Sequence, residues 1–323
     1  MFKISDFVIQ EKLKSPTIEA FGKTLCAEGE KNEKIVAIAA DLAGSVKLNL
    51  FGAQFPDRYF NVGIAEQNMY GIASGMAKCG LIPFAGTFSV FASLRALDQI
   101  HTDICYQNQN VKIIGTHGGT SFGQGGSTHH AIEDLAVIRS LANMTLICPA
   151  DATETSLATV AAVNNFGPYY IRLNRGTSPV VYKTDSYGFT VGKAVKLTDG
   201  EDATIIACGS AVYQALQAAI KLYEEKKISV RVLDMHTIKP IDKESIIAAV
   251  KATGHIITAE DHTIIGGLGG AVAEVIAENG IGCKFKRLGI NDKFSPMGLP
   301  DDLLKIHGID SESIAKSVED LLK

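Results

Sequence analysis

Apolar and polar positions alternate along the chain in a way that predicts an α/β protein with mainly parallel sheets. Short runs rich in β-branched residues are separated by longer stretches in which apolar residues recur every three or four positions. That order of strand and helix is typical of parallel sheets joined by crossover helices. In the first part of the chain we expect strands at Ile35–Ala40, Tyr59–Val62, Leu81–Ala85, Val111–Gly115, Thr145–Cys148 and Tyr169–Leu173.

We expect helices between these strands at residues 64–78, 89–107 and 152–165. The third helix has a clear start, because Asp151 can cap its first turn and Glu154 can complete a capping box. The first helix carries Gly71 and Gly75 among alanines, which predicts that its backbone packs closely against another element.

The periodic pattern lapses within TSPVVYKTDSYGFTVG, residues 177–192, and a second α/β series follows it. A chain of 323 residues fits two domains at the usual ~100–200 residues each. We therefore expect one α/β domain at residues 1–188 and another at residues 189–323. Strands of the second domain are expected at Ala203–Cys208, Val230–Leu233, His255–Ala259 and Lys284–Leu288.

Composition and charge narrow the class of protein. Hydrophobic residues make up 46% and charged residues 20%, as in globular proteins. The net charge of −4 argues against a nucleic-acid partner, because phosphate binding needs a basic face. The N-terminus alternates charged with apolar residues, so we expect no membrane span, no signal peptide and a cytoplasmic location. Six widely spaced cysteines favour reduced thiols over disulfides or a zinc site.

Two glycine-rich stretches match nucleotide-binding loops only in part. GTHGGTSFGQGGSTHH, residues 115–130, lacks the Lys-Ser or Lys-Thr of a phosphate-binding loop. GGLGGAV, residues 266–272, ends in Val272 where the dinucleotide fingerprint has Gly or Ala. A tight turn and close helix packing explain the second stretch better, and we expect His262 nearby to be structural.

Histidines gather around the first of these stretches. His101, His117, His129 and His130 lie within thirty residues, without the cysteine partner or HExxH spacing that would indicate a metal site. Adjacent His129 and His130 should point in different directions on an extended chain. A loop with hydrogen-bonding imidazoles suits a polar ligand such as a sugar or a phosphate, and structural roles stay open.

Glu66 is the only carboxylate in NVGIAEQNMYGIASGMAKCG, residues 61–80. A charge among small apolar residues is costly to bury unless something compensates it. Glu66 is therefore either a surface residue stabilised by the dipole at a helix start or a buried group that takes part in chemistry.

Several ordered motifs resemble the C-terminal half of transketolase, in particular the separate small subunit of split transketolases. They are NVGIAEQNM (61–69), GTFSVFASLRALDQI (86–100), GTHGG (115–119), GSTHHAIEDLAVIRSLANMTLICPAD (126–151) and PYYIRLNRG (168–176). DATIIACGSAVYQALQAA and GHIITAEDHTIIGGLGG resemble the C-terminal domain of that family, so the likeness runs from about residue 16 to the end. It implies a pyrimidine-binding domain followed by this C-terminal domain. The implied reaction is transfer of a two-carbon ketol unit from a ketose phosphate to an aldose phosphate.

The resemblance also implies a thiamine diphosphate site. Glu66 matches the catalytic carboxylate that hydrogen-bonds N1′ of the aminopyrimidine ring, where it holds or shares a proton. Phe88 matches the aromatic residue that stacks on this ring, Phe91 lines the same pocket, and Asp41 matches an aspartate close to the cofactor.

Contacts with a sugar phosphate are implied for four positions. Ser45, His117 and Arg172 match phosphate-binding residues, and His129 matches a catalytic histidine near the reacting hydroxyl and carbonyl of the donor. A dianionic phosphate suits a guanidinium with neutral donors around it. Taken alone, Arg172 could equally form a strand-end salt bridge, and Ser45 a helix cap.

Three positions depart from the family pattern. A phosphate-binding arginine of many transketolases falls at Ile18, an aspartate that reads hydroxyl stereochemistry falls at Gly125, and a pocket tyrosine falls at Leu94. These losses weaken the assignment of substrate more than that of cofactor. Either the acceptor differs from the usual pentose phosphates or a partner chain supplies the missing contacts.

The diphosphate half of the site is absent from the sequence. Transketolases hold the diphosphate through a divalent metal bound by a Gly-Asp-Gly motif, and no such motif occurs here. The resemblance therefore implies an N-terminal, diphosphate-binding partner subunit that brings Mg²⁺, in an α2β2 heterotetramer. The alternatives are half of a deoxyxylulose-phosphate synthase, a 2-oxoacid dehydrogenase β subunit or, from another class, a non-catalytic regulatory subunit.

Overall fold

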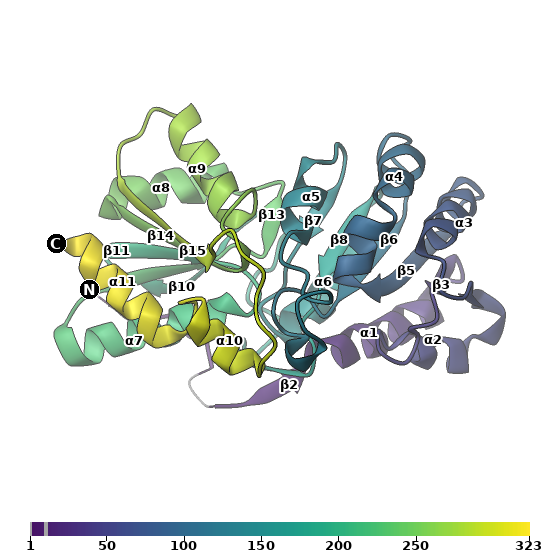
Figure 1. The fold of residues 1–323 in the computed structure, drawn as a ribbon, viewed down its shortest axis with the longest axis horizontal. Helices are drawn as coiled ribbons and strands as arrows, with labels where there is room; N and C mark the ends of the chain where they lie inside the picture. Colours follow the sequence, from purple (N-terminus) through teal and green to yellow (C-terminus); the bar gives the residue numbers. More distant parts are fainter. Residues whose placement is uncertain (1, 10–11) are drawn as a thin grey trace.

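The computed structural model describes residues 2–9 and 12–323, which fold into two α/β domains set side by side (Figure 1). Six strands of the first domain agree with the predicted strands to within a few residues: β3 Ile35–Ala39, β4 Tyr59–Asn61, β5 Ile82–Phe88, β6 Lys112–Thr116, β7 Thr145–Ile147 and β8 Tyr169–Arg172. They run parallel in the order β7-β8-β6-β5-β3-β4. The prediction of a mainly parallel sheet is thus confirmed.

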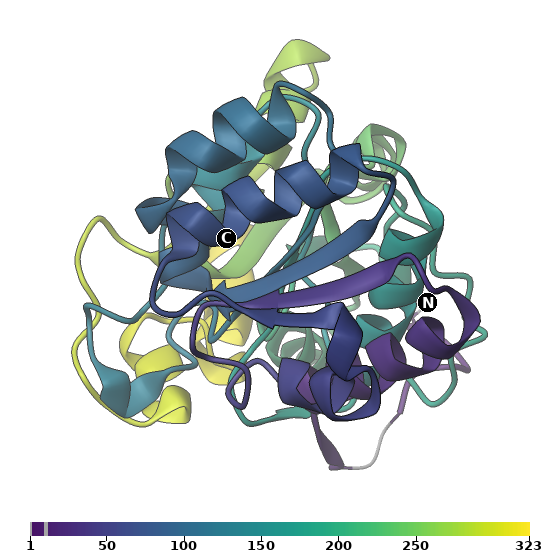
Figure 2. The same ribbon diagram turned by 90° about the vertical axis from the view of Figure 1, so that its right-hand side faces the viewer.

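The helices of the first domain are α1 Thr17–Lys31, α2 Leu48–Gln54, α3 Glu66–Lys78, α5 Asp134–Ser140 and α6 Ala152–Asn164, with 3₁₀ turns at η1 Pro56–Arg58 and η4 Gly123–Gly125. Helices lie on both faces of the sheet, α3 on one and α1 with α2 on the other (Figure 2). Because both faces are covered, the central strands β3, β5 and β6 are buried along their whole length.

The segment predicted as one helix at residues 89–107 is divided into three parts. Two π-helical stretches, η2 Phe91–Arg95 and η3 Ile100–Cys105, flank the short helix α4 Leu97–Gln99. π-Helical turns are frequent at functional sites. The irregular backbone after β5 is therefore a first indication of where a site lies.

The predicted start of α6 is confirmed in part. Asp151 caps the helix, because its Oδ1 accepts a hydrogen bond from Glu154 N at 2.9 Å. Glu154 does not close the predicted capping box on Asp151. Its Oε2 accepts instead from Ala150 N at 2.7 Å, one residue before the cap.

The face of α3 that carries Gly71 and Gly75 is open. Apart from the adjoining residues and the backbone of α3 itself, no heavy atom of the described chain lies within 4 Å of the position that a Cβ would take at either residue. The predicted close packing is therefore wrong for this chain on its own. Ile64, just before the helix, is 77% exposed, which leaves small and apolar residues uncovered along this element.

The second domain is built on a six-stranded sheet. Its strands are β1 Lys3–Ile4, β10 Val195–Asp199, β11 Ala203–Ala207, β12 Val230–Asp234, β14 His255–Thr263 and β15 Lys284–Ile290, in the order β1-β10-β12-β11-β14-β15. The last four strands of that order are parallel, as predicted, whereas β1 and β10 add an antiparallel edge. Its helices are α7 Ala211–Lys226, α8 Lys243–Thr253, α9 Leu268–Glu278, α10 Pro300–Ile306 and α11 Ser311–Leu322.

Short strands cross between the two halves of the sequence. The N-terminal β1 joins the second sheet, so both chain ends lie at that domain (Figure 1). In return, β13 Thr237–Lys239 pairs antiparallel with β7 of the first sheet. A separate two-stranded sheet, β2 Lys14–Pro16 with β9 Thr177–Pro179, stays within the first half of the sequence. Sheet membership thus does not follow the predicted boundary at residues 188 and 189, because strands of two or three residues carry no periodic signal.

All six cysteines are free: Cys105, Cys148 and Cys208 are buried, Cys26 and Cys283 are half-buried, and Cys79 is exposed. Buried thiols of this kind behave as small apolar residues. Within residues 2–9 and 12–323, no helix is both long and apolar enough to cross a membrane.

Candidate functional site

The predicted site residues follow neighbouring strands of the first sheet. Asp41 comes after β3, Glu66 after β4 and His117 directly after β6, while Phe88 ends β5 and Arg172 ends β8. Because the carboxyl ends of parallel strands share one edge of a sheet, the fold brings these positions to the same side of the domain. The topology therefore explains why residues far apart in sequence meet here.

Glu66 is buried in the first turn of α3, with 2% of its surface exposed. Its Oε1 accepts a hydrogen bond from Arg95 Nη1 at 2.9 Å. Its Oε2 has no hydrogen-bond partner in the described part of the chain. The helix dipole and the guanidinium offset the cost of burying this charge. Glu66 is therefore an internal carboxylate with one oxygen still available.

Aromatic rings and imidazoles form one cluster that is linked to Glu66 through Arg95, whose guanidinium carbon lies 3.8 Å from the centroid of the Phe91 ring. The ring of Phe88 lies 4.2 Å from that of His117, 5.3 Å from that of Phe122 and 5.7 Å from that of Phe91, between centroids. His129 completes the cluster, 5.5 Å from Phe91 and 5.3 Å from Phe122. The structure thus brings together four predicted residues and adds Phe122, which the sequence did not single out.

His117 is held in a strained backbone conformation, with φ of 61°, and Asp41 has the same φ. Non-glycine residues in this region are uncommon and cluster at functional sites. Burial, followed by the charges of Arg175 and His129, lowers the pKa of His117 to about 3. His117 is therefore neutral near pH 7. Its Nδ1 contacts Thr116 Oγ1 at 2.9 Å, and its Nε2 has no partner among the described residues.

His129 and His130 point in different directions, as predicted. His129 Nδ1 contacts Thr128 Oγ1 at 3.1 Å, and its ring joins the aromatic cluster. His130 is 2% exposed, and its Nε2 donates to the carbonyl oxygen of Gly123 at 2.9 Å. Of the two, only His129 faces the cluster, whereas His130 holds the glycine-rich loop. His101 is exposed on η3.

Arg172 lies in a buried ion pair, with 3% of its surface exposed. Its Nε and Nη2 each donate to Asp134 at 3.0 Å, and Nη2 also donates to the carbonyl oxygens of Ala131 and Asp261. The contact with Asp261 reaches into the second domain. This is the strand-end salt bridge that the sequence left open, and it leaves little of the guanidinium for a phosphate.

Arg175, three residues further on, is exposed and lies against the cluster. Its guanidinium carbon is 4.8 Å from the centroid of the Phe122 ring, and its Nη1 donates to the carbonyl oxygen of Phe122 at 3.0 Å. Arg175 is not among the residues predicted from the sequence, although both arginines occur in the same motif. Their positions relative to β8 distinguish the two arginines. Arg172 is the last residue of this fully buried strand, whereas Arg175 lies in the exposed segment after it.

Asp41 and Ser45 lie on the same edge, and within the described part of the chain no hydrogen bond or ion pair joins them to the aromatic cluster. Asp41 N donates to Asn61 Oδ1 at 2.9 Å, which ties the ends of β3 and β4 together. Ser45 is exposed before α2 and does not cap that helix, whose N-cap is Lys47. Ser45 is therefore free to bind a ligand.

The departures at Gly125, Leu94 and Ile18 have different surroundings. A Cβ at Gly125 would come within 1.7 Å of Phe122 Cδ1, so the Phe122 ring occupies the space that a side chain at this position would need. Leu94 is 47% exposed, whereas Ile18 is 6% exposed and packs in the core.

The donor set fits one end of the implied cofactor. The unpartnered Oε2 of Glu66 and the adjacent rings of Phe88 and Phe91 suit a flat heterocycle with one hydrogen-bonding nitrogen. Within the described part of the chain, no group of three or more His, Cys, Asp or Glu side chains could hold a metal ion. A diphosphate needs cations to offset its charge, so the metal and diphosphate end does not fit this chain alone.

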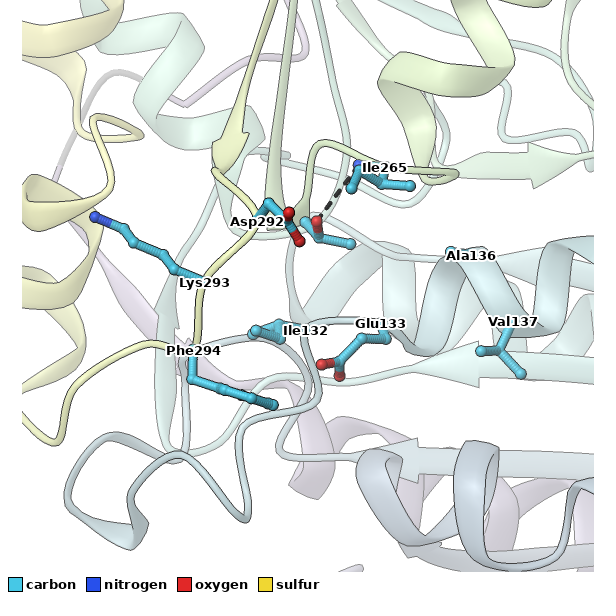
Figure 3. A pocket seen from close by; sticks show the side chains of 9 residues that line it. Ile132, Glu133, Ala136, Val137, Ile265, Asp292, Lys293 and Phe294 are labelled. Atoms are coloured by element: carbon cyan, nitrogen blue, oxygen red, sulfur yellow. Dashed lines mark hydrogen bonds between the residues drawn. The ribbon is translucent and has the colours of Figure 1, made fainter.

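An apolar hollow of about 350 Å³ lies elsewhere, between α5 and loops of the second domain (Figure 3). Ile132, Ile265 and Phe294 line it together with Glu133 and Asp292. None of the residues of the aromatic cluster lines it, so it is separate from the candidate site.

Comparisons with known proteins agree with this picture. Residues 14–180 match the sequence family "Transketolase, pyrimidine binding domain", and residues 192–314 match "Transketolase, C-terminal domain". A protein of Methanocaldococcus jannaschii assigned as a transketolase C-terminal section is 45% identical over 94% of this chain and 96% of its own. One of the subunits of the apulose-4-phosphate transketolase of Phocaeicola vulgatus is 39% identical over 94% and 97%. The solved structure of a split-gene transketolase, an inactive β4 tetramer, superposes with a TM-score of 0.88 at 43% identity, over 95% and 98%.

Proposed function

Because the chain belongs to the transketolase family, we propose that it supplies the aminopyrimidine side of a thiamine diphosphate site in a two-chain transketolase. The complete enzyme would transfer a two-carbon ketol unit from a ketose phosphate to an aldose phosphate. The observation that carries this proposal is Glu66, a buried carboxylate with one free oxygen beside an aromatic cluster. A pure binding module has no evident need for such a group.

Thiamine diphosphate, when bound, supplies the carbon nucleophile of this reaction. Glu66 Oε2 would share a proton with N1′ of its aminopyrimidine, while Oε1 stays with Arg95. Phe88 and Phe91 would pack against the ring and exclude water from the shared proton. Asp41, on the neighbouring strand end, would complete the cofactor side.

The sugar phosphate would bind on the side of the imidazoles. His117 Nε2 has no partner within the described part of the chain, and because the ring is neutral it can donate to or accept from a substrate hydroxyl. His129 would act near the reacting hydroxyl and carbonyl. For the phosphate we propose Arg175 with Ser45, since Arg172 is committed to Asp134.

A partner subunit would bring the diphosphate site and the divalent metal, for which we propose Mg²⁺. The open face of α3, with Gly71, Gly75 and the exposed Ile64, is the surface that we propose it covers. By the symmetry usual for oligomers, two copies of each chain would give an α2β2 assembly.

The substrate need not be a common pentose phosphate. Two features of the site, the Phe122 ring over Gly125 and the exposed Leu94, change the wall that would read substrate hydroxyls. A related transketolase chain is named for apulose 4-phosphate. We propose a sugar phosphate acceptor and include that compound with the pentose phosphates in the test.

The test is a titration of thiamine diphosphate and Mg²⁺ into the chain alone and into its mixture with a partner that carries a Gly-Asp-Gly motif. We expect tight binding and ketol transfer only in the mixture. Tight binding by the chain alone would contradict the shared site. Turnover of pyruvate would favour the synthase or dehydrogenase alternative, and binding without any turnover would favour a regulatory subunit.

A further inference from the structure

We propose that Arg95 is a positioning residue that keeps Glu66 ionised in the cofactor-free chain, so that cofactor binding brings a proton into the site. The first part of this inference concerns the chain alone. The second part, the proton, rests on the proposed function.

The two side chains of the Arg95–Glu66 pair differ strongly in their exposure to solvent. Arg95 keeps 44% of its side chain exposed, whereas Glu66 keeps 2%, so the guanidinium closes the outer side of a carboxylate that lies behind it. The guanidinium carbon also lies 3.8 Å from the centroid of the Phe91 ring. Phe91 and Arg95 begin and end the same π-helical stretch, η2, which sets one above the other. The ring thus fixes the cation that faces Glu66.

No other group near Glu66 can replace this cation. Tyr70, one turn along α3, is fully buried, and its hydroxyl has no hydrogen-bond partner among residues 2–9 and 12–323. Burial, followed by the charge of Glu66, raises the pKa of Tyr70, so it is neutral at physiological pH. The charged or titratable groups on the neighbouring elements are Asp98 on α4 with His101, Asp103 and Cys105 on η3, and within the described part of the chain none of them pairs with Glu66.

The physical consequence follows from the cost of a buried charge. An isolated buried carboxylate avoids that cost by taking up a proton, whereas a carboxylate paired with a guanidinium stays ionised. Arg95 therefore decides whether Glu66 is charged before the cofactor arrives. Because the bond uses Oε1 alone, Arg95 can stay in place and hold the carboxylate still while Oε2 receives the ligand.

Proton balance then distinguishes the two states of the site. The contact between Glu66 and a neutral aminopyrimidine N1′ contains one shared proton. If Glu66 starts as a carboxylate, that proton must come from solvent, and binding takes up on the order of one proton per site. If Glu66 starts protonated, binding takes up none at this position.

Infrared difference spectra of the cofactor-free full chain test the first part directly. The Glu66→Gln variant serves as the reference in each case, so that only the Glu66 signal remains. At neutral pH we expect the ionised carboxylate band in the wild type and in Arg95→Lys, and the protonated carboxyl band in Arg95→Gln. A carboxylate band in Arg95→Gln would overturn the proposal.

Calorimetric titration of thiamine diphosphate into the assembled enzyme, in buffers of different ionisation enthalpy, tests the second part. We expect uptake of about one proton more for the wild type than for Glu66→Gln, and little difference between Arg95→Gln and that baseline. Arg95→Lys should restore the uptake. A matched control is Arg231→Gln, which removes an arginine paired with Asp199 in the second domain and should not change it.

The two experiments fail in distinguishable ways. If the wild-type assembly binds no thiamine diphosphate, the proposed function fails, while the infrared result still decides the charge of Glu66. If it binds the cofactor with equal proton uptake in the wild type and Arg95→Gln, the proposed function stands and the role of Arg95 is wrong.

Discussion

Two buried glutamates, Glu66 and Glu260, lie beside helix N-termini in the two domains, yet their surroundings differ. Glu260, on β14, is fully buried and accepts hydrogen bonds at both oxygens, from Leu268 N at 2.7 Å and Gly269 N at 2.8 Å. Glu66 uses one oxygen and leaves the other free. A carboxylate whose capacity is spent on the backbone belongs to the fold, whereas one that is half used is available to a ligand.

The sheet edges that carry the two glutamates bear on the same contrast. At the end of β14 the side chains turn toward the first domain: Asp261 accepts from Thr120 Oγ1 at 2.9 Å, and His262 Nε2 accepts from Ala136 N at 3.3 Å. A Cβ at Gly267 would come within 2.1 Å of Glu260 Oε2, so the GGLGG stretch does serve close packing and His262 is structural. Both edges therefore meet where the domains join, through Arg172 and Thr120 on one side and Asp261 on the other, whereas Glu66 lies outside this contact.

Of the substitutions that test this difference between the two glutamates, Glu66→Gln should have the largest effect, and the effect should be on turnover. In the assembled enzyme we expect Glu66→Gln to lower ketol transfer by about 10³-fold or more, because proton sharing with the cofactor is lost. The measurement is kcat/KM at saturating partner, with the elution volume of the complex as the control for assembly. Turnover within tenfold of the wild type would contradict the assigned role.

The residues of this site show which features could be predicted from the sequence and which could not. The strands, and the positions that follow them, were predictable because periodicity and motif both mark strand ends. Arg95, Phe122 and Arg175 were not, because each depends on a contact between segments: a π-helical turn that faces α3, a loop ring that fills the space at Gly125, and an arginine exposed only after β8 ends. The exchanged β1 and β13 are too short to leave a periodic pattern.

Glu260→Ala should lower the stability of the chain, whereas Glu66→Gln should lower turnover. Removing the carboxylate leaves two amide N–H groups of α9 without partners in a buried place. We expect a loss of about 3–5 kcal/mol in the free energy of unfolding. Denaturant unfolding of the chain measures it, with Glu278→Ala on the exposed end of α9 as the control. A loss below ~1 kcal/mol, within the usual surface range, would show that the backbone does not depend on this cap.

A third buried carboxyl group, that of Asp234, should make the free energy of unfolding depend on pH. Asp234 Oδ2 accepts a hydrogen bond from the Tyr182 hydroxyl at 2.6 Å, and the side chain lies near Asp151 and Glu154. Burial raises the pKa of Asp234 to about 7 from 3.8. Between pH ~4 and ~7 the folded chain therefore binds more protons than the unfolded chain. The free energy of unfolding gains a contribution from this proton that is complete below pH ~4 and is lost as the pH rises through ~7.

We expect that loss to be on the order of 2–4 kcal/mol between pH ~4 and ~7. Denaturant unfolding at several pH values measures it, with Asp234→Asn as the variant in which the dependence should become weaker. Part of it should remain, because burial also raises the pKa of Glu154, Glu260 and Asp261. The same slope in Asp234→Asn would assign it to other groups.

The two arginines of the PYYIRLNRG motif separate binding from folding once more. Arg175→Ala should raise KM for the sugar phosphate by about 10- to 100-fold, the value of one charge-assisted contact of ~1.5–3 kcal/mol. Because Arg175 is exposed, its loss should change the unfolding midpoint only slightly. Arg172→Ala should instead lower that midpoint, because Asp134 would stay buried without its partner. If Arg175→Ala leaves KM unchanged while Arg172→Lys raises it, the phosphate contact belongs to Arg172 after all.

The smallest expected effect concerns the wall of the site at Gly125. A side chain there meets the Phe122 ring, so Gly125→Asp should cost about 1–3 kcal/mol of stability as the ring is displaced. The same substitution made in Phe122→Ala should cost less than half as much, since the ring is gone. Thermal unfolding of the four chains measures this difference. If Gly125→Asp costs the same stability in both backgrounds, strain in the loop, and not the Phe122 ring, keeps position 125 a glycine. Residues 122 and 125 would then affect the choice of substrate independently.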